Sequence, residues 1–138
     1  MAANTSYCVG PAVLAAILAH AAAAAPAEAC GLVLGAESRI DAAVPAVNVA
    51  ERPERGFEID PATLLRVHRE ARGSGRSVVG WYHSHPNGAR QPSATDAARA
   101  VEDGRLWLIA AAGQVTAWRA AAGGPVHGRF VAVDLVAG

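Results

Sequence analysis

Two histidines and an aspartate stand at a spacing that suits a metal ion. His83 and His85 lie two residues apart at the end of a Val-Val-Gly-Trp-Tyr stretch that is typical of a β-strand. Side chains two apart on a strand point to the same face of the sheet. After His85 come the seven-residue loop Pro86–Pro92, then Ser-Ala-Thr, then Asp96. If this loop turns back over the strand end, Asp96 can reach the two histidines. Three protein ligands with a fourth place for water are typical of catalytic zinc.

Each part of this pattern also has a simpler explanation. A lone His-x-His pair can arise by chance on an exposed strand. Ser93 and Asp96 have the spacing of a capping box, in which Ser93 caps a helix and Asp96 is its N3 partner. The two roles are compatible, because Ser93 can cap the helix or face the site while Asp96 turns towards the metal. Glu28, just ahead of an apolar strand, would by itself be a solvated loop carboxylate.

Taken together, these residues resemble the motif of the JAMM metallopeptidases, which are also called the MPN+ or Mov34/JAB family. The motif is a distant upstream Glu, then His-x-His, seven residues, Ser, two residues and Asp. It is complete here as Glu28, His83, His85, Ser93 and Asp96. The flanking sequences EACGLVLG and GWYHSHP match as well, and the resemblance covers most of the chain.

The resemblance implies a cofactor and a role for each residue of the motif. One Zn²⁺ per chain would be bound by His83, His85 and Asp96. Zinc lowers the pKa of a water ligand from about 15.7 towards about 7. Glu28 would act as the general base and pass the proton to the leaving amine. Ser93 would donate a hydrogen bond to the water or to the developing oxyanion. The expected activity is that of a zinc metallopeptidase, which is a hydrolase.

The compact length resembles the stand-alone bacterial members, similar to those that act on ubiquitin-like sulfur-carrier proteins. We therefore expect a peptidase or isopeptidase that cuts an amide bond at the C-terminal Gly-Gly tail of such a protein. The chain has no room for the insertions with which larger deubiquitinating relatives hold ubiquitin, which argues against ubiquitin chains as substrate. The alternative is a catalytically inactive MPN-type scaffold, although all the ligands are present. A zinc deaminase is excluded, since neither cysteine stands in a Pro-Cys-x-x-Cys pattern.

Periodicity, turn residues and caps predict the elements that would position these side chains. The first half of the chain is predicted to form a strand at Thr5–Val9, a helix from Pro11 to about Ala24, paired strands at Ala29–Leu34 and Ile40–Val49, and a helix capped by Asp60 that runs from Pro61 to near Gly73. The second half is predicted to form a strand at Arg76–His85, a helix at Ser93–Asp103 closed by Gly104, a hairpin of Arg105–Ala111 and Val115–Ala121, and a last strand at Val126–Val136. We therefore expect an α/β protein with a JAMM/MPN-like mixed, largely antiparallel curved sheet flanked by helices.

Length and composition indicate one globular domain, residues 1–138. The chain is 52% hydrophobic and 17% charged, which argues against disorder. Its 12 basic residues, all Arg, balance 12 acidic ones, so charge gives no reason to expect nucleic acid or a membrane as partner. The apolar run Pro11–Ala27 has no basic n-region and is broken by Pro26, so it fits neither a signal peptide nor a membrane span. We expect a cytoplasmic protein, and a homodimer is left open.

The remaining histidines and tryptophans receive structural explanations. His20, His68 and His127 have no partner at ligand spacing, so we expect them to be structural or at the surface. Trp107 and Trp118 are expected to pack in the core or in the hairpin.

Overall fold

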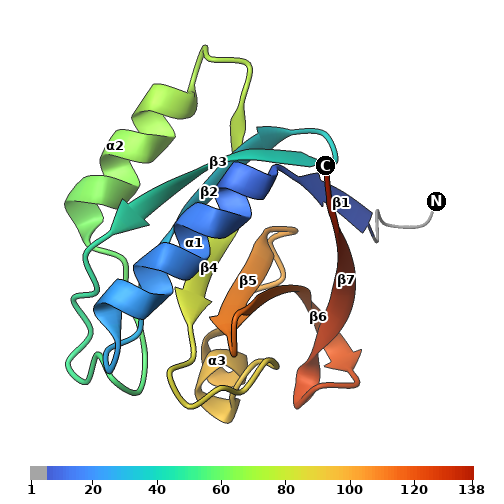
Figure 1. Ribbon diagram of the computed structural model, residues 1–138. Coiled ribbons are helices and arrows are strands. Elements are labelled where there is room, and N and C mark those ends of the chain that lie inside the picture. The colour runs from blue at the N-terminus through green and yellow to red at the C-terminus, as the bar shows by residue number, and fades with distance from the viewer. Residues whose placement is uncertain (1–5) are drawn as a thin grey trace.

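The structure, a computed structural model, describes residues 6–138, whose strands close into a barrel (Figure 1). The strands are β1 (Ser6–Val9), β2 (Cys30–Ala36), β3 (Arg39–Ala46), β4 (Ser77–Ser84), β5 (Leu106–Ala111), β6 (Gln114–Gly124) and β7 (Gly128–Ala137). The helices are α1 (Pro11–Ala24), α2 (Pro61–Ala71) and α3 (Ala94–Arg99). Thr5, the predicted start of the first strand, lies outside the described residues.

The sheet is mixed, as predicted, and antiparallel pairs join most of its neighbours. Strands β2–β3, β2–β4, β5–β6 and β6–β7 are antiparallel, whereas β4–β5 is parallel. The short β1 pairs in parallel with both β3 and β7, and this double pairing closes the curved sheet into a barrel. The parallel step from β4 to β5 requires a crossover connection, and the loop after β4 together with α3 supplies it.

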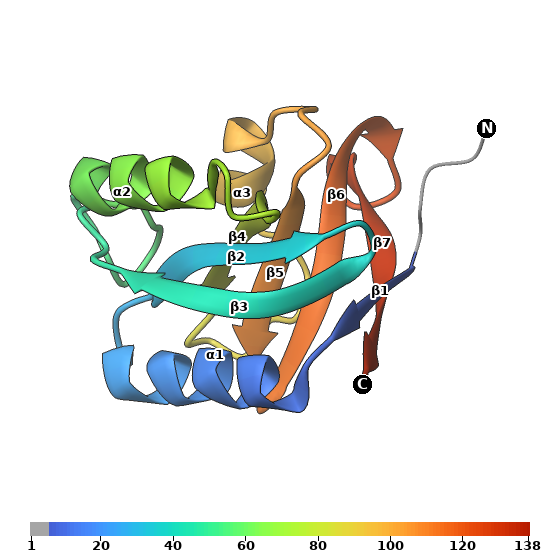
Figure 2. The ribbon, with the colours of Figure 1, turned by 90° about the horizontal axis from the view of Figure 1, so that it is seen from above.

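Helices α1 and α2 lie on opposite sides of the β2–β3 pair (Figure 2). Helix α1 begins with Pro11, which suits the first turn because its missing N–H would have no helical partner. Helix α2 is capped by Asp60, whose carboxylate accepts a hydrogen bond from the Thr63 N–H, as the sequence predicted. In the described part of the chain no helix is long enough to cross a bilayer; α1, the longest, has 14 residues against the roughly 20 required.

Successive side chains of β4 point to opposite faces of the sheet, so this strand contributes to the core on one face and to the site on the other. Tyr82 is buried beneath α1 in the same cluster as Val13 and Ile17. The next residue, His83, points to the other face, where its ring stacks on Phe57 at a centroid distance of 4.3 Å. Trp107 and Trp118 are buried in the cluster on that second face, so their predicted core packing is confirmed.

Helix α3 is shorter than the sequence predicted, because it ends at Arg99 and not at Asp103. Two side chains beyond its end bond to backbone N–H groups outside a helical pattern: Glu102 accepts from Ala122 N–H, and Asp103 accepts from Arg105 N–H. Such bonds compete with helix continuation. Gly104 has a positive φ of 80° but lies in a bend, so the predicted C-cap at Gly104 is wrong.

Candidate metal centre and catalytic cleft

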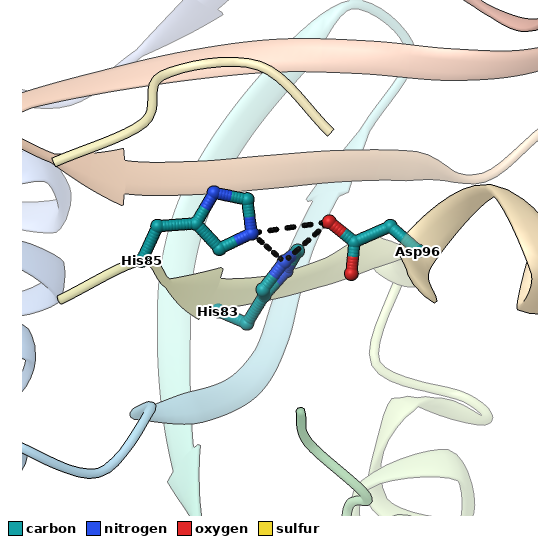
Figure 3. A group of neighbouring side chains, drawn as sticks. All are labelled: His83, His85 and Asp96. Atoms are coloured by element: carbon teal, nitrogen blue, oxygen red, sulfur yellow. Dashed lines mark hydrogen bonds and ion pairs between the residues drawn. The ribbon is translucent and has the colours of Figure 1, made fainter. Parts of the chain in front are cut away.

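The end of β4 and the start of α3 bring together three side chains that could hold a metal ion (Figure 3). The Nε2 atoms of His83 and His85 are 3.1 Å apart. Asp96 Oδ2 lies 3.2 Å from His83 Nε2 and 3.1 Å from His85 Nε2. A tetrahedral ion with bonds of about 2.0–2.1 Å places its ligand atoms about 3.3 Å apart. The three atoms therefore match one face of a tetrahedral site.

The surroundings of His85 prepare its ring to bind a metal through Nε2. Its Nδ1 lies 2.8 Å from the carbonyl oxygen of Ala89 in the loop after β4. A carbonyl only accepts, so Nδ1 carries a proton, and in the neutral ring Nε2 keeps its lone pair. Partners of this kind fix the tautomer of metal-binding histidines. Two imidazoles and a carboxylate, all buried, form a donor set that suits a divalent ion such as zinc.

Burial and the hydrogen bonds within the cluster shift the pKa values of its members. Burial lowers the pKa of His83, which keeps this ring neutral. Burial also opposes charge on His85, yet bonds to Asp96 and to the Ala89 carbonyl raise the pKa of His85 above 6.5. Burial works against ionisation of Asp96 too, but its bonds to both histidines hold the pKa of this carboxyl below its ordinary value. A metal must therefore displace a proton from His85, and binding should weaken in acid.

Ser93 and Asp96 form the predicted capping box while Asp96 also faces the histidines. Ser93 Oγ accepts a hydrogen bond from Asp96 N–H at 3.0 Å, and Asp96 Oδ2 accepts from Ser93 N–H at 2.9 Å. The capping explanation and the ligand explanation are thus compatible in the folded chain. Ser93 Oγ acts as an acceptor in this bond, which leaves its O–H able to donate, and Ser93 lines the cleft.

Glu28 is buried beside this cluster, although it is distant from it in the sequence. The pairing of β2 with β4 sets Cys30 opposite His83, and Glu28 precedes that pair by two residues. Glu28 Oε1 has no hydrogen-bond partner among the described residues. Burial is the main influence that raises the pKa of this carboxyl to about 7, and the nearby Asp96 charge adds to it. A carboxyl with this pKa can accept and release a proton near neutral pH.

The structure places Glu28, His85 and Ser93 on the wall of one cleft of about 430 Å³. The loop after β4 and the start of α3 form one side. Residues 49–58, which we call the 49–58 loop, contribute Glu54 and Arg55 to the other. The candidate metal cluster therefore borders, through His85, a cavity whose wall also carries Glu28, a carboxyl able to take up a proton. Metal-assisted hydrolysis of an amide bond uses this combination.

Several residues around this cleft were not predicted from the sequence. His127 lines its rim, where the expectation was a structural or surface role. Phe57 covers one side of His83, and Arg99 lies over the Phe57 ring and donates to its carbonyl. No short motif contains these residues, because they come from distant parts of the chain. By contrast, His20 donates to or accepts from the Tyr82 hydroxyl at 2.7 Å, which agrees with the structural role expected of it.

Comparison with known proteins relates the chain to a family and to individual relatives. Residues 10–121 match the family described as prokaryotic homologs of the JAB domain. The desampylase of Haloferax volcanii is 40% identical over 99 residues, which cover 67% of this chain and 71% of that protein. The CysO-cysteine peptidase of Mycobacterium tuberculosis is 36% identical over 96 residues, which cover 68% of this chain and 65% of that one.

A solved structure supports the fold as well. The JAB1/MPN domain protein of Archaeoglobus fulgidus superimposes with a TM-score of 0.59 over 96% of this chain and 99% of its own, at 20% sequence identity. At this identity the likeness concerns the fold alone, and it confirms the predicted fold class.

Proposed function

Because the chain belongs to the prokaryotic homologs of the JAB domain and is a hydrolase of the JAMM type, we propose that it is a zinc-dependent peptidase. In this proposal residues 1–138 form one catalytic domain. His83, His85 and Asp96 hold one zinc ion, Glu28 is the general base, and Ser93 assists the reaction at the carbonyl oxygen.

In this proposal the metal ligands, Glu28 and Ser93 each have a separate role in amide hydrolysis. Zinc bound by the three ligands would polarise the scissile carbonyl and make a water molecule acidic enough to lose its proton near neutral pH. Glu28 accepts that proton and later delivers it to the leaving amine. The Ser93 O–H donates a hydrogen bond to the carbonyl oxygen as negative charge develops there. Such a bond strengthens in the transition state and so raises kcat.

The observation that carries this proposal is the state of Glu28. A carboxyl that is buried, has an oxygen without a partner and lies in the cleft of the metal cluster is costly to maintain. A general base explains that cost, since burial brings the pKa of Glu28 to about 7. An inactive scaffold would need neither this carboxyl nor the complete ligand set. Both features favour the enzyme over the scaffold.

The proposed substrate is the C-terminal Gly-Gly tail of a ubiquitin-like or sulfur-carrier protein, cut after the second glycine. The names of the relatives support this class, since one is a desampylase and another a CysO-cysteine peptidase. The size of the cleft, about 430 Å³, supports it too. This value is at the lower end of ligand pockets, which measure about 300–1,000 Å³. A cleft of this size suits an extended tail, and glycines without side chains let the scissile backbone approach the metal.

A substrate panel tests the proposal. Zinc-loaded protein is incubated with a ubiquitin-like sulfur-carrier protein extended beyond its Gly-Gly by one cysteine, and with the same protein whose Gly-Gly is replaced by Ala-Ala. An unrelated unfolded peptide completes the panel. Mass spectrometry should show loss of the extension from the Gly-Gly protein alone.

Two other outcomes would change the assignment. Equal cleavage of the unrelated peptide would leave a general peptidase and remove the specificity for Gly-Gly tails. If the protein carried its zinc ion and cleaved nothing in the panel, the inactive scaffold would be the better explanation.

A further inference from the structure

We propose that Asn48 is a positioning residue that holds Glu28 at the metal cluster, an inference that rests on the proposed role of Glu28 as general base. Asn48 follows β3, is partly buried and bonds to the backbone of Glu28. It lies outside the sequence motif of the site. Its side chain forms more hydrogen bonds to the backbone than the side chain of a residue in a simple turn does.

The amide nitrogen of Asn48 joins Glu28 to the 49–58 loop. Asn48 Nδ2 donates to the backbone carbonyls of Glu28 at 3.0 Å, Gly56 at 3.0 Å and Pro53 at 3.3 Å. An amide group has two hydrogens for these three acceptors, so one hydrogen is shared. A single side chain therefore ties the backbone of the proposed base to two points of the 49–58 loop.

The amide oxygen of Asn48 completes the arrangement. Oδ1 accepts from Ala50 N–H at 3.0 Å and from Glu58 N–H at 3.1 Å. A primary amide can donate two hydrogens to carbonyls on one side and accept from N–H groups on the other. Aspartate lacks the donors, and serine is too short to span both sets.

The backbone of Glu28 is fixed from three directions, whereas its carboxylate is not. Glu28 N–H donates to the Pro53 carbonyl at 2.7 Å, and its carbonyl accepts from Asn48. The adjacent Ala29 N–H donates to Ser84 Oγ at 2.7 Å. Glu28 Oε1, by contrast, has no partner in the described part of the chain. The carboxylate must therefore be positioned through its backbone, and Asn48 supplies the contact that also fixes the loop.

The same loop carries a residue that touches the metal cluster. Phe57 lies between two of the backbone groups bound to Asn48, those of Gly56 and Glu58, and its ring stacks on His83. Asn48 thus links the backbone of the proposed base to the loop segment that carries Phe57. A displacement of about 1 Å in such a pair can cost about 100-fold in rate.

The test compares Asn48→Ala with a matched control, Asp60→Ala. The control removes hydrogen bonds from Val47 N–H, next to Asn48, and from Thr63 N–H, but it touches neither Glu28 nor the cleft. Both variants are measured with zinc bound on the Gly-Gly substrate. Asn48→Ala should lower kcat about 10- to 100-fold and leave KM and zinc content unchanged. Asp60→Ala should keep the wild-type kcat.

A double mutant separates positioning from general destabilisation. If Asn48 acts through Glu28, Asn48→Ala should have little further effect on kcat in a Glu28→Gln background. Additive losses in the double mutant, or equal kcat losses in Asn48→Ala and Asp60→Ala, would overturn the inference. Asn48→Ser, which can keep the bond to Ala50 N–H but cannot reach Glu28, serves if the alanine variant does not fold.

Hydrogen exchange provides a readout that does not depend on activity. The Glu28 amide should exchange at least about 10-fold faster in Asn48→Ala than in the wild type or in Asp60→Ala, because its acceptor on Pro53 is no longer held. Unchanged protection would overturn the inference. A wild-type protein that cleaves no substrate would contradict the proposed function, while the exchange data would still decide whether Asn48 fixes Glu28.

Discussion

Replacing Glu28 by glutamine should make the metal-free protein more stable and the enzyme nearly inactive. The two side chains have almost the same shape, but glutamine carries no charge into the buried cleft. Because a neutral amide costs far less to bury than a carboxylate, the substitution removes a penalty that the folded protein bears for its proposed base. Without the base, kcat should fall about 10²- to 10⁴-fold while zinc is retained.

The size of the stability change follows from the pKa of Glu28. Burial raises this pKa from 4.5 to about 7 in the folded chain. The folded state therefore holds the proton more tightly than the unfolded state, and stability falls as the pH rises between these two values. One pH unit corresponds to about 1.4 kcal/mol, so ionisation of Glu28 costs up to about 3 kcal/mol above pH 7. Below pH 4.5 the cost disappears, because the carboxyl is protonated in both states.

Urea unfolding of the chelator-treated proteins at pH 8 and pH 5 measures this difference. At pH 8 Glu28→Gln should exceed the wild type by up to about 3 kcal/mol, or roughly 10 °C in Tm for a chain of this size. At pH 5 most of the gain should vanish. The metal must be absent, since a bound cation would lower the pKa of Glu28 and stabilise the folded state by itself.

Glu54→Gln is the matched control, because Glu54 lines the same cleft but is exposed. It should change neither the stability difference between the two pH values nor, by more than a few fold, kcat. Equal stability of Glu28→Gln and the wild type at pH 8, or a gain of the same size at pH 5, would refute the argument from burial. A wild-type kcat in Glu28→Gln would refute its role as base.

Three further predictions concern the metal cluster. His83→Ala and Asp96→Ala should each lower the zinc content well below one ion per chain, measured by elemental analysis after dialysis; full retention in both would contradict the ligand assignment. Ser93→Ala should keep zinc, lower kcat and cost about 0.5–2 kcal/mol in urea unfolding, because α3 loses its N-cap; unchanged stability would contradict the cap. Zinc affinity, measured by competition with a chelator, should fall as the pH drops through the pKa of His85, which lies above 6.5; constant affinity between pH 5 and 8 would contradict this reasoning.

Local patterns in the sequence were sufficient for much of the fold. Pro11 at the first turn of α1 and Asp60 before α2 mark helix starts through chemistry within a few residues. Alternation along the strand predicted at Arg76–His85 placed both histidines on one face, because the side chains of any strand alternate. The end of α3 was not predictable in the same way. Glu102 binds Ala122 N–H, which is 20 residues away, and this contact depends on where β6 runs.

The site shows the same division between local and long-range information. Residue types and spacing in the sequence suggested His83, His85 and Asp96 as a metal site, and resemblance to a family supported that set and drew attention to Glu28. Only the tertiary structure placed Glu28 in the same cleft, through the register that sets Cys30 opposite His83. No turn joins β2 directly to β4, because β3 and α2 lie between them in the chain, so turn geometry does not set this register and the packing of the buried faces does. The contacts of Asn48 likewise exist only once β2, β3 and the 49–58 loop have met, because every carbonyl to which it donates comes from backbone that folding brings within reach.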